Sequence, residues 1–126
     1  MTKPRTPAIL QATGRRFWRE MIAKYEFRPD ELRILEDCCA EIDLIDDLAS
    51  RQRGAERVVK GSMGQPVINP LISELRQHRA TLATLLGKLQ LPDDDAGSVS
   101  DSVPGSRVRS TAARHAANAR WRGGDA

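Results

Sequence analysis

The side chains that could carry chemistry in this 126-residue chain are arginines, carboxylates, two histidines and two cysteines. His78 and His115 lie in different segments, and no histidine and cysteine cluster has the spacing of a metal site. Cys38 and Cys39 are adjacent, and neighbours on a helix point about 100° apart, so a disulfide between them would be strained. We interpret both thiols as small apolar residues in a reducing compartment.

Two other patterns that could support catalysis do not fit a catalytic site. The loop at residues 61–64 (GSMG) lacks the Lys-Ser/Thr pair that contacts phosphate and magnesium in nucleotide-binding loops. Six carboxylates between residues 36 and 47 could suggest a magnesium site, but a solvated helix face explains them more simply. We therefore predict a protein that is not an enzyme and needs no cofactor or metal. The six carboxylates are Glu36, Asp37, Glu41, Asp43, Asp46 and Asp47.

Charge is segregated along the chain, which predicts surfaces with different partners. Residues 1–28 carry seven basic and two acidic side chains (+5), residues 29–56 three and nine (−6), and residues 57–92 five and one (+4). A helix-turn-helix over residues 14–53 would place its acidic second helix in the major groove of DNA, which argues against that motif. Two basic groups remain as candidate contacts for DNA phosphates. They are Lys3, Arg5, Arg15, Arg16, Arg19 and Lys24 in the first group, and Arg57, Lys60, Arg76 and Arg79 in the second.

The elements that position these side chains are mostly helical. We predict a flexible basic arm at 1–13, a short helix from Gly14 capped by Thr13, and a long helix over 29–53. A small β-hairpin near 57–68 then leads to a second long helix, which begins after the natural cap Asn69 and ends before Pro92. The fold class is all-α with a small β-hairpin: a long antiparallel helical hairpin plus a short N-terminal helix, forming a core at 14–92.

Both long helices carry more apolar residues than one contact stripe can bury. Leucines at helical spacing line the helix after Asn69, and a hairpin of two short strands is marginal in water by itself. Because exposed contiguous apolar surface usually marks an interface, we predict that the core assembles into a ring of identical subunits. The predicted interface residues are Leu75, His78, Leu82, Leu85 and Leu86. His78 itself is interpreted as a partly buried histidine that bonds to a neighbour.

Residues 93–126 are rich in Gly, Ser and Asp and predict a disordered linker followed by a partner-binding segment. That segment offers an aromatic anchor with flanking charge. Its candidate docking residues are Arg114, Arg120, Trp121 and Arg122. No apolar run approaches the roughly 20 residues that cross a bilayer, and the first residues lack a signal-peptide core, so we expect a soluble intracellular protein.

Several fragments, taken in order, resemble the small terminase subunits of tailed double-stranded-DNA bacteriophages. They are GRRFWREMIAKYEFRPDELRILEDCCAEID and then VVKGSMGQPVINPLISELRQHRATLATLLGKLQLPDD, which together cover about residues 14–94. The resemblance implies a non-catalytic DNA-packaging factor in the host cytoplasm. Such proteins form rings, bind viral DNA and regulate the large terminase subunit, which carries the ATPase and nuclease. Many relatives have an N-terminal helix-turn-helix, which this chain lacks.

Two alternatives stay open at the level of the sequence. One is a helical scaffolding or interaction protein that does not bind DNA. The other is a small dimeric DNA-binding regulator that recognises a palindrome. Particle mass and a DNA titration separate these alternatives from a packaging factor.

Overall fold

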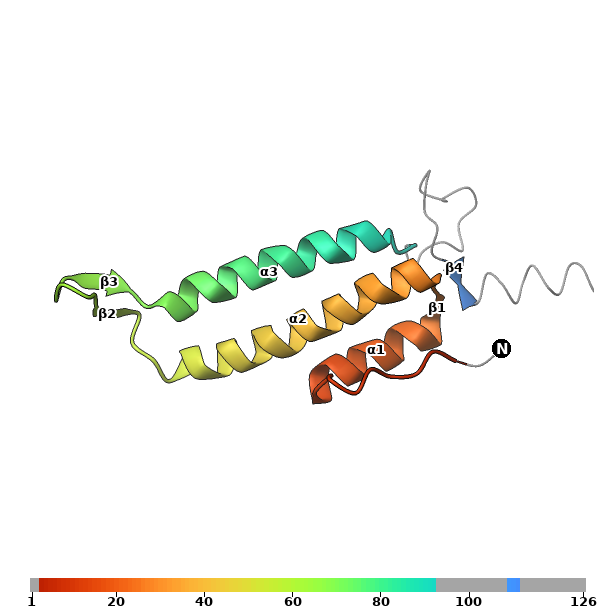
Figure 1. The fold of residues 1–126 in the computed structure, drawn as a ribbon, viewed down its shortest axis with the longest axis horizontal. Coiled ribbons are helices and arrows are strands. Elements are labelled where there is room, and N and C mark those ends of the chain that lie inside the picture. The colour runs from red at the N-terminus through yellow and green to blue at the C-terminus, as the bar shows by residue number, and fades with distance from the viewer. Residues whose placement is uncertain (1–2, 93–108, 112–126) are drawn as a thin grey trace, which may run out of the picture.

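The computed structural model describes residues 3–92 and 109–111. Two long helices, α2 (Pro29–Arg53) and α3 (Pro70–Leu89), run antiparallel, and the shorter α1 (Ala12–Lys24) lies against the first part of α2 (Figure 1). α2 packs against both other helices, whereas α1 and α3 have little direct contact. The strands β2 (Val58–Lys60) and β3 (Pro66–Ile68) form the hairpin between the long helices. The predicted mostly helical fold with a small β-hairpin is confirmed.

Local signals explain where the two long helices begin and end. Pro29 opens α2, and Glu31 accepts a hydrogen bond from the backbone N–H of Arg28 (2.8 Å). Gly54 follows the last residue of α2 as predicted. Asn69 caps α3 by accepting from the backbone N–H of Leu71 (3.1 Å). These contacts satisfy amides that have no partner within the helix, and they fix the bounds of both helices.

The predicted cap of α1 was wrong. The helix begins at Ala12, so Thr13 lies inside it, and the N-cap residue Gln11 makes no side-chain capping bond. Asp43 of α2 takes over this role, because its two carboxylate oxygens accept from the backbone N–H groups of Gln11 and Gly14, each at 2.7 Å. A carboxylate also favours the positive end of a helix, so one α2 side chain both caps α1 and fixes its position.

Close approach of α1 to α2 depends on Gly14. A Cβ atom at this position would lie 2.7 Å from the carbonyl oxygen of Cys39 and would overlap the Asp43 carboxylate. The neighbouring residue, Thr13, donates its hydroxyl to Asp46 (3.0 Å), which lies one turn after Asp43 on α2. The N-terminus of α1 therefore contacts α2 more closely than any residue larger than glycine would permit.

The hydrophobic core occupies one end of the molecule, where α1, the first half of α2 and the end of α3 meet. Leu10, from the segment before α1, is also fully buried in it, which anchors that segment. The interpretation of the two cysteines as apolar core residues is confirmed, and both thiols are free. The buried members of this core are Leu10, Trp18, Met21, Tyr25, Leu35, Cys38, Cys39 and Leu89.

The other end of the molecule is much less enclosed. There the second half of α2 faces the first half of α3, and Leu75 is the buried apolar residue. The hairpin projects beyond both helices (Figure 1) and pairs Val58 with Ile68 and Lys60 with Pro66. Gly64 adopts φ +79° in the turn, a conformation that favours glycine.

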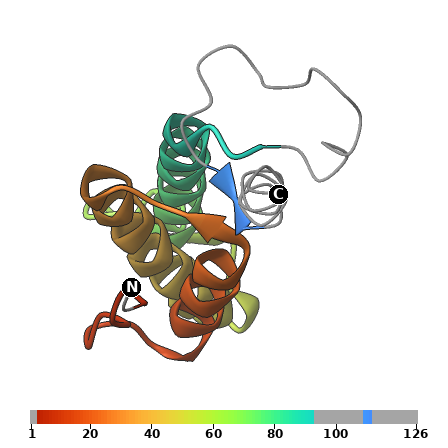
Figure 2. The same cartoon turned by 90° about the vertical axis from the view of Figure 1, so that its right-hand side faces the viewer.

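A second strand pair was not predicted. β1 (Tyr25–Glu26), directly after α1, pairs antiparallel with β4 (Arg109–Ser110), as Figure 2 shows at the end of the bundle. The hydroxyl of Thr111 donates to the carbonyl oxygens of Ala23 (3.3 Å) and Lys24 (3.1 Å). A piece of the tail therefore returns to the folded part and bonds carbonyls at the end of α1. Among the described residues, no helix is long and apolar enough to cross a membrane.

Candidate nucleic-acid interface

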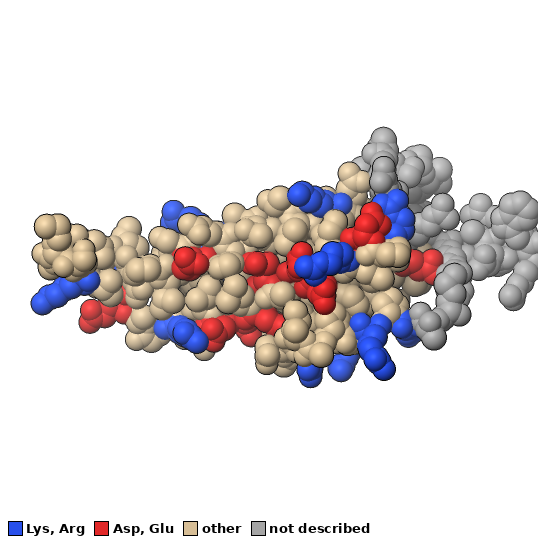
Figure 3. Space-filling model, in the orientation of Figure 1, with Lys and Arg blue, Asp and Glu red and all other residues tan. Residues whose placement is uncertain are grey.

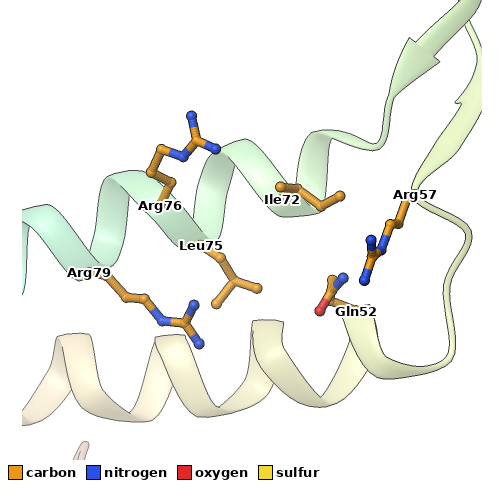
Figure 4. Close-up of a pocket in the computed structure, with 6 residues that line it drawn as sticks. All are labelled: Gln52, Arg57, Ile72, Leu75, Arg76 and Arg79. Atoms are coloured by element: carbon orange, nitrogen blue, oxygen red, sulfur yellow. The ribbon is translucent and has the colours of Figure 1, made fainter.

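Three arginines gather around a groove between α2 and α3 near the hairpin. Arg57, Arg76 and Arg79 line a hollow of about 460 Å³ together with Gln52, Ile72 and Leu75. In Figure 4 the guanidinium of Arg79 lies between the two helices, and that of Arg57 points toward Gln52. Arg76 extends from α3 away from α2 in the same view. The six residues give this arginine groove a cationic rim and an apolar wall.

None of the three arginines is neutralised within the part of the chain that the structure describes. Arg28, Arg33 and Arg51 make ion pairs with carboxylates, whereas the three groove arginines make none. Their guanidinium groups carry charge at every physiological pH and present several donors in one plane. That geometry suits phosphate oxygens, which accept two parallel bonds from one guanidinium.

The backbone fixes how these residues converge. Arg76 and Arg79 are three residues apart on α3, so they are neighbours on that helix, but only Arg79 points toward α2 in Figure 4. Arg57 enters from the loop after α2, where its carbonyl accepts from the N–H of Asn69 (2.8 Å). Asn69 also donates its side-chain N–H to the carbonyl of Glu56 (2.9 Å). The cap of α3 thus holds Arg57 close to the first turns of that helix.

The sequence predicted this second basic group only in part. The structure brings Arg57, Arg76 and Arg79 together, whereas Lys60 lies on β2 and does not line the groove. Gln52, in the last turn of α2, was not predicted, and no spacing pattern singled it out. Gln52 is half-buried, and its place in the groove follows from the structure alone.

The first predicted basic group lies elsewhere, on the arm and the exposed side of α1. Arg15, Arg16 and Arg19 are all exposed, and Lys24 lies 5.4 Å from the centre of the Tyr25 ring. Lys3 and Arg5 are exposed on the arm before α1. In Figure 3 a band of carboxylates runs between α1 and α3, so acidic surface separates the α1 arginines from the groove. The two basic groups are therefore separate surfaces on one chain.

The predicted interface leucines pack within the chain itself. Leu75 is buried, and Leu82, Leu85 and Leu86 are half-buried against the core. Their contact with a second subunit stays a prediction. The interpretation of His78 is confirmed: its Nδ1 lies 2.7 Å from Glu41 of α2, and its Nε2 lies 3.3 Å from Glu74. This histidine links the two long helices.

The cysteines are unsuited to nucleophilic chemistry. Burial, with the nearby charge of Asp37 as a smaller cause, raises the pKa of Cys38 to about 11. Burial and the neighbouring Cys38 raise the pKa of Cys39 to about 12. Since the thiolate is the reactive form, both side chains stay protonated at neutral pH. Within the described ranges, no group of three or more His, Cys, Asp or Glu side chains could hold a metal ion.

A second hollow, of about 360 Å³, lies under the arm. Pro4, Trp18, Leu32 and Arg33 contribute to its lining. Arg33 is already paired with Glu36 (2.6 Å) and Asp37 (3.2 Å), so this hollow has less free positive charge than the arginine groove.

The predicted docking residues Arg114, Arg120, Trp121 and Arg122 lie outside the described residues. Comparison of the chain with protein-family models, with curated proteins and with solved structures gives no match.

Proposed function

We propose that the chain is a non-catalytic DNA-packaging factor of the small-terminase kind, which binds duplex DNA through its arginine groove. The observation that carries this proposal is that three arginines, none in an ion pair among the described residues, line one groove between α2 and α3. Phosphate contacts dominate the affinity of proteins for DNA, and guanidinium groups are well suited to make them. The resemblance of residues 14–94 to small terminase subunits adds the biological setting.

In this proposal the subunit assembles into a ring and regulates a large terminase subunit that performs the chemistry. Each copy contributes one arginine groove, so a weak contact with phosphate is repeated around the assembly and strengthened by multivalency. The segment around Trp121 is the proposed contact with the large subunit, because it combines an aromatic anchor with flanking arginines.

The groove is tested by comparing three triple variants with the same loss of positive charge. The test variant replaces Arg57, Arg76 and Arg79 with Ala. A second variant replaces Arg15, Arg16 and Arg19, the competing basic group on α1. The control replaces Arg28, Arg33 and Arg51, each of which is already paired with a carboxylate.

The measurement is a titration of duplex DNA at several salt concentrations. Each lost phosphate contact makes the slope of log K against log salt less steep by about 0.9. The groove variant should therefore lose up to about three such contributions per subunit. The control variant should lose much less, because its arginines are neutralised locally. If the α1 variant shows the loss and the groove variant does not, DNA binds the α1 surface. If the wild-type chain binds no DNA, the packaging proposal fails and the scaffolding alternative stands.

A further inference from the structure

The β2–β3 hairpin exposes apolar side chains that no other described part of the chain covers. Val58, Met63 and Ile68 are 53%, 90% and 66% exposed. Val58 and Ile68 are directly paired across the two strands, so they lie on the same face of the hairpin. Neither strand makes an extensive contact with a helix. A two-stranded hairpin of this kind is marginal in water without a surface to pack against.

A second exposed apolar residue lies in the middle of α2. Leu44 is 39% exposed and lies between Asp43 and Asp46, the two carboxylates that bond the start of α1. Glu41 and Asp47, three residues before and after, flank it on the same side of the helix. Residues 33–51 carry six carboxylates and two arginines, Arg33 and Arg51, which pair with three of the carboxylates, so the net charge of this stretch is −4.

The hairpin end carries the opposite charge. Residues 53–68 hold three basic side chains and one acidic, a net charge of +2. Their basic members are Arg53, Arg57 and Lys60, and Glu56 is the acidic one. An apolar hairpin with basic surroundings and an apolar residue with acidic surroundings are therefore present on one chain. Complementary potentials of this kind steer association and set its orientation.

We propose that the hairpin of one subunit docks on the Leu44 region of α2 in a second copy of this chain. This inference rests on the self-association in the proposed function, and it supplies that assembly with two defined surfaces. The hairpin face and the Leu44 region are different surfaces, so the contact is heterologous. Each subunit gives its hairpin to one neighbour and receives a hairpin from another, which leads to a ring when the rotation closes.

A complementation experiment distinguishes this contact from every symmetric one. The hairpin variant carries Met63→Asp and Ile68→Asp, and the helix variant carries Leu44→Asp. Each variant loses one of the two surfaces and keeps the other. By native mass spectrometry, wild type should give a closed assembly, and each variant alone should be monomeric. An equal mixture of the two should give a one-to-one heterodimer and nothing larger, because only one intact pair of surfaces is available.

Two controls separate docking from folding. Ile9→Asp changes a residue that is 69% exposed and lies outside both surfaces, and should assemble as wild type does. Met63→Asp alone changes a side chain that is 90% exposed, so it cannot disturb the core, and it should still weaken assembly. Circular dichroism should give the same helix content for all variants.

The outcomes are distinct. A monomeric wild type, a Leu44→Asp variant that assembles normally, or a mixture that stays monomeric would each overturn the proposed contact. A DNA titration of the same samples tests the packaging function separately. Assembly without DNA binding would support the proposed contact and refute the packaging function. Monomers that bind DNA through the groove would refute the proposed contact and support DNA binding.

Discussion

The two ends of the helical hairpin differ in how completely they are packed. At the α1 end, eight apolar residues from five segments are buried together. At the β-hairpin end, Leu75 is buried, three arginines without an ion pair among the described residues line the groove beside it, and the hairpin beyond carries three exposed apolar side chains. α1 makes this difference, because it covers only the first part of α2. The packed end stabilises the fold, and the open end keeps its side chains available for binding.

The largest expected effect is the loss of a core leucine at the packed end. Leu35→Ala should lower the free energy of unfolding by about 2–5 kcal/mol, because Leu35 is fully buried and a cavity would remain. Ile72→Ala, at the half-buried wall of the arginine groove, should cost about half as much or less. Chemical denaturation measures both. Equal losses would show that the open end contributes to stability as much as the packed end does.

A smaller effect is expected where α1 meets α2. Gly14→Ala should destabilise the fold by about 1–3 kcal/mol, because the new Cβ would overlap Asp43 and the backbone of Cys39. Gly87→Ala is the matched control in α3, where a Cβ would meet nothing within 4 Å. That change should stabilise the protein by roughly 0.5–1 kcal/mol, since alanine favours a helix over glycine. Thermal melts of the two variants should shift in opposite directions; a neutral Gly14→Ala would mean that α1 is loosely held.

The smallest expected effect is the dependence of stability on pH at the packed end. The pKa values of Cys38 and Cys39 are raised by burial from 9.0 to about 11 and 12, so the unfolded chain releases these protons at lower pH than the folded chain does. The unfolded state is then favoured as pH rises above 9, and stability should fall by about 1 kcal/mol per thiol by pH 10. Denaturation at pH 8 and pH 10 measures the loss. A Cys38→Ala/Cys39→Ala variant should lose less over the same interval, and an identical loss would show that other groups cause it.

The parts of the fold that local sequence governs were predictable. Pro29, Gly54 and Asn69 fixed the bounds of the long helices within a residue or two, because each acts on its own neighbours. The cap of α1 was not predictable in this way, since Asp43 lies about thirty positions from the amides it binds. The pairing of β1 with β4 likewise joins segments far apart in the sequence.

The candidate site shows the same division. Arg76 and Arg79 could be grouped by their helical spacing, and Arg57 was included by charge alone. The loop after α2 decides that Arg57 lines the groove and that Lys60 does not. Gln52 lines the groove only because the last turn of α2 lies opposite the first turns of α3. Tertiary contacts decide which residues line the site, and the periodicity of the sequence does not reveal those contacts.

The capping of α1 by Asp43 has a consequence for the order of folding. α1 has 13 residues and no capping bond from its own N-cap side chain, so it should be largely unstructured in isolation. α2 and α3 adjoin through a short hairpin and can pair while α1 is still open. Amide hydrogens in α1 should therefore exchange with solvent through partial openings that leave α2 and α3 protected. Replacing Asp43 with Asn should accelerate exchange in α1 more than in either long helix.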